Sequence, residues 1–237
     1  FNITRNHVVF MDLPVVWDFE GMESSGLPVV WDESYGARLG VMPRNGTDAD
    51  VRWFDINPCY VFHPMNAYEE GNKIILDVCR METAMKPGVN SPPQLYRWVI
   101  DLDKGTVSES QTDDRTVDFT RICDTRVGLK NRYGYGAAFG GGMPVAVGFL
   151  KYDLEKDSSE YHDLGGGLGS EPVFVKDPNG KDEDDGWVLS YVYQPEINKS
   201  EIVIVDSRAF DKDPVARIHL PVRVPAGFHG NWVPDGY

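Results

Sequence analysis

The chain contains 237 residues, 41% of them hydrophobic, and carries a formal net charge of −14. An acidic surface of this kind repels phosphate groups, so no nucleic-acid partner is expected. No apolar run approaches the ~18–20 residues that a membrane-spanning helix requires. The three cysteines, Cys59, Cys79 and Cys123, lack CxxC spacing, and their odd number favours a reducing compartment, which predicts a cytoplasmic protein.

The chain begins with "FNITRNHVVF", which lacks the basic and apolar regions of a signal peptide and enters a strand-like pattern directly. Long windows with helical periodicity are missing, and 24 Gly and 16 Pro punctuate short runs of β-branched and aromatic residues. This pattern predicts an all-β fold. The runs are, in order, "HVVFMDLPVVW", "KIILDVCRM", "LYRWVIDLD", "VAVGFLKYDLE", "GWVLSYVYQ" and "EIVIVDSRAF".

The strands recur with a regular spacing. Asp55, Asp101, Asp153 and Asp206 each end an apolar strand, and they lie 46, 52 and 53 residues apart. The carboxylate of such an Asp can accept backbone N–H groups of the following turn. A period near 50 residues is typical of β-propeller blades, so the chain is predicted to form about four blades, with a β-sandwich as the alternative.

Two histidines stand out by their surroundings. His63 follows the apolar run "CYVF", and His229 lies in "RVPAGFHGNWVPDG". In a propeller the inner strands present residues of distant blades to one axis, so the two imidazoles could share a metal such as iron, zinc, copper or nickel. For each histidine taken alone, a structural role is favoured over metal binding.

Two carboxylates are candidates for orienting such histidines. Glu171 in "GSEPVFV" and Asp118 in "TVDFTRI" are single acids set against apolar strands. A metal-bound imidazole usually donates its second N–H to a carboxylate or carbonyl. The alternative for both residues is a strand-edge carboxylate that faces water. The acidic run "KDEDDG", residues 181–186, is predicted to be a solvated turn.

Three segments in order resemble the carotenoid cleavage oxygenases, and within them the bacterial members grouped with lignostilbene dioxygenases. They are "CYVFHPMNAYEEGNKIILDV", "SEPVFVKDPNGKDEDDGWVLSYVY" and "LPVRVPAGFHGNWVP". The resemblance implies a seven-bladed propeller that holds a non-haem Fe(II) ion through four histidines. His63 matches the third ligand, His229 the fourth, and Glu171 a glutamate that orients them. Asp118 stands where the family usually has Glu, and its side chain is one methylene shorter.

The resemblance also implies an activity: cleavage of a carbon–carbon double bond by O₂ to give two carbonyl products. The expected substrate is an apolar conjugated small molecule, a carotenoid, apocarotenoid or stilbenoid, held by aromatic residues. Four phenylalanines lie near the motifs: Phe62, Phe119, Phe139 and Phe228. Phe62 and Phe228 are the predicted substrate contacts, and core packing is favoured for most of the four. Peripheral membrane contact of the intact protein is implied as well.

Residues 1–237 are expected to form the C-terminal part of a single propeller domain whose first blades and first two iron ligands precede Phe1. The chain alone is therefore expected to be inactive. His7, His162 and His219 fall outside the ligand motifs and are interpreted as surface or blade residues.

Two other functions remain open from the residues alone. One is a non-catalytic propeller that serves as a binding scaffold. The other is a carbohydrate-active propeller that uses paired acids, with tryptophans as sugar platforms. Those tryptophans would be Trp53, Trp98, Trp187 and Trp232.

Overall fold

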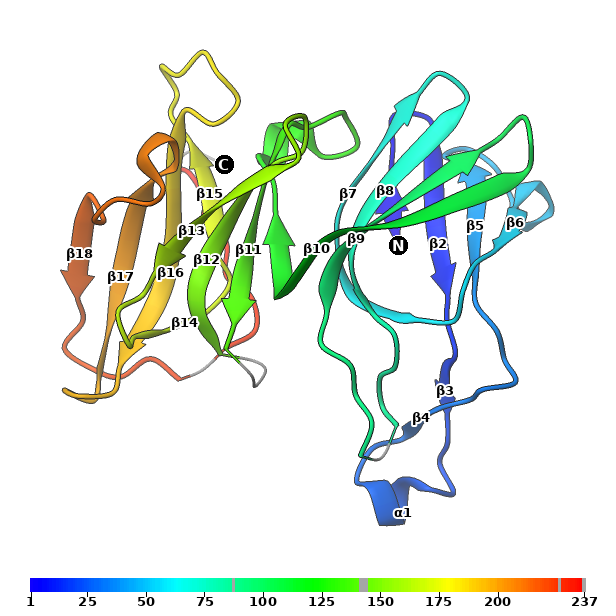
Figure 1. The fold of residues 1–237 in the computed structure, drawn as a ribbon, viewed down its shortest axis with the longest axis horizontal. Helices are drawn as coiled ribbons and strands as arrows, with labels where there is room; N and C mark the ends of the chain where they lie inside the picture. Colours follow the sequence, from blue (N-terminus) through cyan, green and yellow to red (C-terminus); the bar gives the residue numbers. More distant parts are fainter. Residues whose placement is uncertain (87, 141–144, 226, 236–237) are drawn as a thin grey trace. The chain divides into compact units, whose positions relative to one another are not determined.

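The computed structural model describes residues 1–86, 88–140, 145–225 and 227–235 (Figure 1). Within these ranges the chain is built from strands, with one short α-helix, α1 (Met22–Ser25), and three single-turn 3-10 helices. The all-β prediction is therefore confirmed. The chain divides into two compact units, one of Phe1–Asp114 and Val127–Lys130, the other of Arg115–Arg126 and Asn131–Tyr237.

The first unit contains two antiparallel groups of four strands and a separate hairpin. The first group has the order β1-β2-β5-β6, and the second has the order β7-β8-β9 followed by the first half of β10. Strands β3 and β4 pair with each other, and α1 lies in the loop between them (Figure 1). The strand bounds are β1 (Asn2–Ile3), β2 (His7–Asp12), β3 (Val15–Trp17), β4 (Val29–Trp31), β5 (Arg38–Pro43), β6 (Arg52–Asp55), β7 (Tyr60–Glu70), β8 (Lys73–Met81), β9 (Gln94–Asp101) and β10 (Thr106–Arg121).

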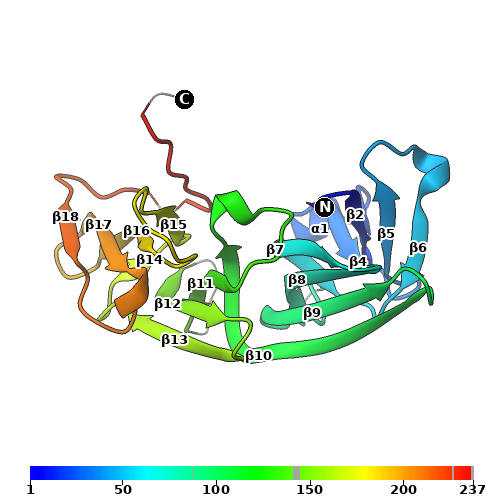
Figure 2. The ribbon, with the colours of Figure 1, turned by 90° about the horizontal axis from the view of Figure 1, so that it is seen from above.

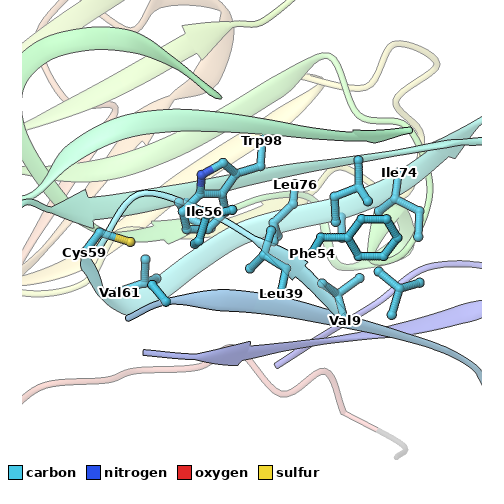
Figure 3. Close-up of a cluster of buried hydrophobic side chains, with 14 residues drawn as sticks. Val9, Leu39, Phe54, Ile56, Cys59, Val61, Ile74, Leu76 and Trp98 are labelled. Carbon is cyan, nitrogen blue, oxygen red and sulfur yellow. The ribbon is translucent and has the colours of Figure 1, made fainter. Parts of the chain in front are cut away.

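One hydrophobic core joins the two strand groups of the first unit (Figure 3). Leu39 and Phe54 of the first group and Leu76 and Trp98 of the second belong to this core, and Leu76 and Trp98 are cross-strand partners. The buried indole N–H of Trp98 donates to Glu109 at 2.9 Å, which satisfies the polar end of an otherwise apolar side chain. Trp98 is thus a core residue, and this burial is incompatible with the sugar-platform alternative for it.

The second unit is antiparallel as well. The second half of β10 pairs with β11, which is followed by β12 and β13, while β14 and β15 lie along one edge of β16, which is followed by β17 and β18. Figure 2 shows β16, β17 and β18 side by side. The bounds are β11 (Tyr133–Phe139), β12 (Ala146–Asp153), β13 (Ser158–Asp163), β14 (Leu168–Gly169), β15 (Val173–Lys176), β16 (Gly186–Gln194), β17 (Lys199–Asp206) and β18 (Ala216–His219).

The predicted aspartate repeat coincides with the strand groups in three of four cases. Asp101, Asp153 and Asp206 end the third strand of their groups, and their carboxylates accept backbone N–H groups of the turn that follows. These bonds confirm the turn role predicted for the aspartate. Asp55 instead ends β6, the fourth strand of its group, which accounts for its irregular spacing.

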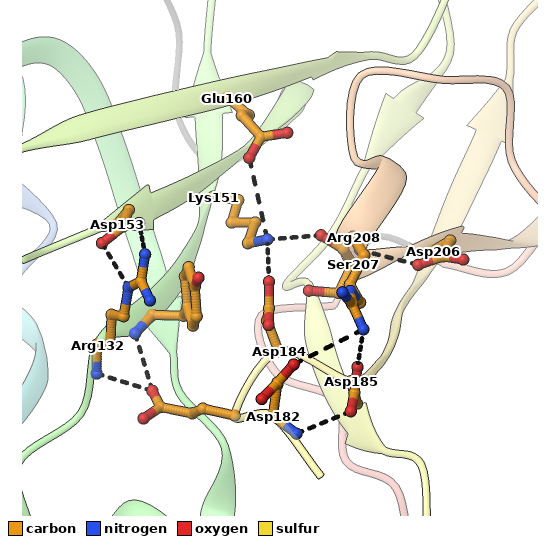
Figure 4. A network of polar contacts seen from close by, with 12 residues as sticks. Arg132, Lys151, Asp153, Glu160, Asp182, Asp184, Asp185, Asp206, Ser207 and Arg208 are labelled. Carbon is orange, nitrogen blue, oxygen red and sulfur yellow. Dashed lines mark hydrogen bonds and ion pairs between the residues drawn. The ribbon is translucent and has the colours of Figure 1, made fainter. Parts of the chain in front are cut away.

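The acidic run at residues 181–186 contains the predicted turn, but only Lys181 and Asp182 are exposed, so the prediction that the whole run is solvated was wrong (Figure 4). Asp184 accepts a hydrogen bond from the buried ammonium of Lys151 at 2.7 Å. Glu183 accepts the backbone N–H groups of Arg132 and Tyr133, each at 2.8 Å. The run folds back because these buried or half-buried donors require acceptors, and it ties β11 and β12 to the start of β16.

None of the helices in the described ranges is long and apolar enough to cross a membrane.

Candidate metal centre

His229 lies beside Glu171 in the second unit. His229 belongs to the irregular segment after β18, and Glu171 lies between β14 and β15. The imidazole Nδ1 is 3.4 Å from Glu171 Oε1, and the other carboxylate oxygen accepts the N–H of Gly230 at 2.8 Å. One carboxylate thus contacts both the ring of His229 and the peptide group that follows it.

Glu171 does not face water, because its side chain is only 5% exposed. A buried carboxylate is costly unless a cation or several donors compensate for it. Arg121, the last residue of β10, supplies such a cation, with its Nη1 3.4 Å from Glu171 Oε2. The structure therefore excludes the water-facing alternative for Glu171, whereas its role toward a metal ligand stays a prediction.

The backbone of β10 is irregular next to this site. The pairing of β10 with β11 shifts between Asp118 and Arg121, and Phe119 has a φ of 51°. A positive φ is uncommon for an aromatic residue and marks a locally constrained backbone. The bulge turns the Phe119 ring edge-on to His229, at 5.5 Å between ring centroids and 84° between planes.

Asp118 is fully buried on β10. One of its carboxylate oxygens accepts the N–H of the next residue, Phe119, at 2.9 Å. Since this bond is local, it holds the bulged backbone in place. The expected link from Asp118 to a ligand histidine stays a prediction.

His63 lies in the first unit, as the fourth residue of β7. The strand β7 continues beyond it to Glu70, and residues after the histidine, such as Asn66, are buried. The register of β7 against β8 shifts on both sides of Pro64, so the strand is irregular beside His63. Phe62 is 40% exposed, and its ring lies 6.2 Å from that of His63.

The two predicted ligands thus belong to different units, and their sharing of one metal stays a prediction. Within the described ranges, no cluster of three or more His, Cys, Asp or Glu side chains is arranged to hold a metal ion. The other histidines have separate settings. His162 is buried, His219 is 75% exposed and contacts Glu201, and His7 contacts Glu69 at 3.0 Å.

A cavity of about 460 Å³ in the second unit lies next to His229. Glu171, Leu189, Tyr191, Ile202 and Trp232 are among its lining residues. Its wall is mainly apolar with a smaller polar part, which is the usual character of a small-molecule site.

The aromatic residues near the motifs separate into two groups. Phe119 and Phe139 are buried and contact each other, so core packing accounts for them. Phe228 is 63% exposed, like the half-exposed Phe62, and its ring is 6.4 Å from that of Phe119. Exposure leaves Phe62 and Phe228 accessible to a ligand, and their contact with substrate stays a prediction.

Sequence reasoning missed Arg121, although this residue contacts Glu171, Gly230 and Asn231 next to His229. Its signal in "TVDFTRI" is weak, since one basic residue at the end of an apolar strand is common on protein surfaces.

Comparisons with known proteins agree with these observations. The protein family described as "Retinal pigment epithelial membrane protein" matches residues 1–234, and the chain belongs to this family. The carotenoid cleavage oxygenase of Mycobacterium tuberculosis is 40% identical over 99% of the chain, and the carotenoid 9,10(9',10')-cleavage dioxygenase of Crocus sativus is 35% identical over 98%. The isoeugenol monooxygenase of Pseudomonas nitroreducens is 31% identical over 99%. These findings confirm the predicted resemblance.

The chain spans about half the length of the relatives it matches: 57%, 47% and 54% of these three proteins in turn. A solved structure of cobalt-substituted apocarotenoid oxygenase from Synechocystis superposes with a TM-score of 0.89 at 28% identity. The superposition covers 98% of this chain and 52% of that one. It confirms the predicted propeller-type fold.

Proposed function

We propose that the protein containing this chain is a non-haem Fe(II)-dependent dioxygenase. It would cleave a carbon–carbon double bond of an apolar conjugated substrate with O₂ and yield two carbonyl products. Support comes from the family and from relatives whose names state carotenoid cleavage or isoeugenol oxidation. Because the chain spans about half of these relatives, the activity is proposed for the whole protein.

The observation that carries this proposal is the contact between His229 and Glu171. With Nδ1 directed at a carboxylate oxygen 3.4 Å away, Nε2 is the nitrogen that a metal would bind. These residues have the chemistry that an iron site would need, and we propose His229 and His63 as two of its ligands. When bound, the iron would supply the capacity to activate O₂ beside an alkene.

The residues of this chain would serve that chemistry by orientation and exclusion of water. Glu171 accepts the Nδ1–H and so selects the tautomer with a lone pair on Nε2. Neutral imidazoles leave the positive charge of a metal uncompensated. The edge of the buried Phe119 ring covers one side of His229 and keeps water from that side.

We propose the cavity beside His229 and the exposed ring of Phe228 as contacts for the substrate. Phe62 would have the same role beside His63. The apolar lining suits a carotenoid, apocarotenoid or stilbenoid better than a charged metabolite.

The test is metal content and product analysis of the whole protein. We expect about one iron ion per chain and aldehyde or ketone products from a conjugated alkene. His63→Ala and His229→Ala should each abolish turnover, whereas His219→Ala, at an exposed position, should leave it unchanged. Turnover by iron-free protein would refute the proposal. Substrate binding without iron or turnover would favour the scaffold alternative.

A peripheral membrane contact is also proposed, at the hairpin of β3 and β4. Trp17 and Phe19 are 70% and 69% exposed, and their rings stack 5.5 Å apart. Met22 and Leu27 are exposed in the same loop. Since Asp18 and other acids alternate with these side chains, the hairpin should prefer zwitterionic over anionic lipid.

Vesicle flotation tests this contact. The wild-type protein should float with phosphatidylcholine vesicles, and the Trp17→Ser/Phe19→Ser double variant should not. Equal flotation of both proteins would rule out the hairpin as the contact. We further propose a cytoplasmic location, for which the three buried cysteine thiols are the support.

A further inference from the structure

Residues 230–231 directly follow His229, and two side chains of other elements hold them. The N–H of Gly230 donates to Glu171 at 2.8 Å, and the carbonyl of Gly230 accepts from Arg121 Nη1 at 3.1 Å. The side-chain oxygen of Asn231 accepts from Arg121 Nη2 at 3.3 Å. The peptide groups on both sides of the Gly230 Cα are therefore fixed.

Arg121 is placed for this task by its strand. It is the last residue of β10, pairs with Tyr135 of β11 and follows the backbone bulge at Phe119. Its side chain is 21% exposed, so water screens its bonds only partly. The fixed fork of a guanidinium can bond a carboxylate and a carbonyl at the same time, which an ammonium group cannot do with the same geometry.

The segment that carries His229 has no regular secondary structure of its own. Backbone and side-chain bonds to Ser200 hold its start at Leu220–Val224, and the bonds of Arg121 and Glu171 hold the residues that directly follow His229. The imidazole itself is more than half exposed, and its contact to Glu171 is long at 3.4 Å. The orientation of the ring therefore depends on the backbone that Arg121 and Glu171 hold.

We propose that Arg121 is a positioning residue for His229. Its guanidinium compensates the buried charge of Glu171 and fixes Gly230 and Asn231, and through them it sets the direction of the imidazole. The consequence for a metal rests on the proposed function, in which His229 is an iron ligand.

The first measurement needs no metal. Hydrogen exchange of the Gly230 amide should be about tenfold faster in Arg121→Met than in the wild type, because a charge-assisted bond next to it is lost. Arg126→Met is the matched control, since Arg126 lies in the adjacent turn and contacts Glu183 instead. The control should leave this exchange unchanged. Arg121→Lys should restore part of the protection, because it keeps the charge and loses the fork.

The second measurement is Co²⁺ binding to the whole protein. Arg121→Met should weaken Co²⁺ binding about tenfold and change the cobalt absorption bands, as is common for residues that orient metal ligands. If this variant does not fold, Asn231→Ala removes one of the acceptors while leaving β10 intact, and it should show the same changes at smaller size. Urea unfolding separates these local effects from a loss of global stability.

The outcomes are distinct. Unchanged Gly230 exchange and unchanged cobalt bands in folded Arg121→Met would overturn the inference. If exchange rises but His229→Ala binds Co²⁺ as well as the wild type, the proposed function fails while the positioning of the segment by Arg121 stands.

Discussion

Glu69 holds the first strands of the chain onto β7. Its carboxylate accepts hydrogen bonds from the Thr4 hydroxyl, from the backbone and side-chain N–H groups of Asn6 at 2.9 and 2.7 Å, and it contacts His7 Nδ1 at 3.0 Å. Burial alone would raise the pKa of Glu69, but these bonds outweigh it and lower the pKa from 4.5 to about 2. A pKa shift of this size corresponds to about 3 kcal/mol in the free energy of unfolding. Because Glu69 is partly exposed, screening by water reduces this contribution to about 1–2 kcal/mol.

The sign of the pH dependence follows from the lowered pKa. The stabilisation by Glu69 is fully present above pH 4.5 and is lost as the pH falls from 4.5 toward 2. Glu69→Gln removes the charge and turns one acceptor into a donor that faces other donors. We therefore expect a loss of about 2–3 kcal/mol in the free energy of unfolding at pH 7.

Urea unfolding at several pH values checks this expectation. Glu70→Gln is the matched control, because Glu70 is the next residue and its bond to Lys130 joins two half-exposed side chains. The control should lose less than about 1 kcal/mol and keep the acid dependence of the wild type. Equal stability of the two variants at pH 7, or the same loss of stability below pH 4.5 in both, would refute the reasoning.

Three further predictions concern the second unit and are each checked by urea unfolding. Lys151→Met should cost about 3 kcal/mol, because it leaves the carboxylate of Asp184 without its ammonium partner. Gly186→Ala should cost about 2 kcal/mol or more, because a Cβ there would lie 2.3 Å from the carbonyl oxygen of Val175, which cannot rotate away. Burial lowers the pKa of His162 below 6.5, so stability should be full above pH 6.5 and fall below it, and His162→Asn should lose this dependence. A loss below 1 kcal/mol for either of the first two, or an unchanged pH profile for the third, would contradict these accounts.

The sequence was sufficient for the strands and for most of the repeat. Runs of β-branched and aromatic residues bounded by Gly and Pro depend on local preferences, so they predicted the strands well. The turn role of Asp101, Asp153 and Asp206 is local in the same way, because the bonded N–H groups lie two or three residues further on.

Features that depend on distant residues could not be read from the pattern. The sequence pattern of the run at 181–186 suggested full solvation because the partners of its buried acids are distant in the sequence. Asp184 bonds Lys151, which is 33 residues away, and Glu183 bonds Arg132, which is 51 residues away. Arg121 was missed for the same reason, since its bonds to Gly230 and Asn231 cross 109 and 110 residues. Only the fold brings such residues together.

The proposed function requires that His63 and His229 bind one metal ion. Proton NMR of the cobalt-substituted whole protein tests it most directly, because an imidazole bound to Co²⁺ shows strongly shifted ring N–H signals. We expect such signals from both residues, with one lost in His63→Gln and another in His229→Gln. Shifted signals that persist unchanged in both variants would contradict it.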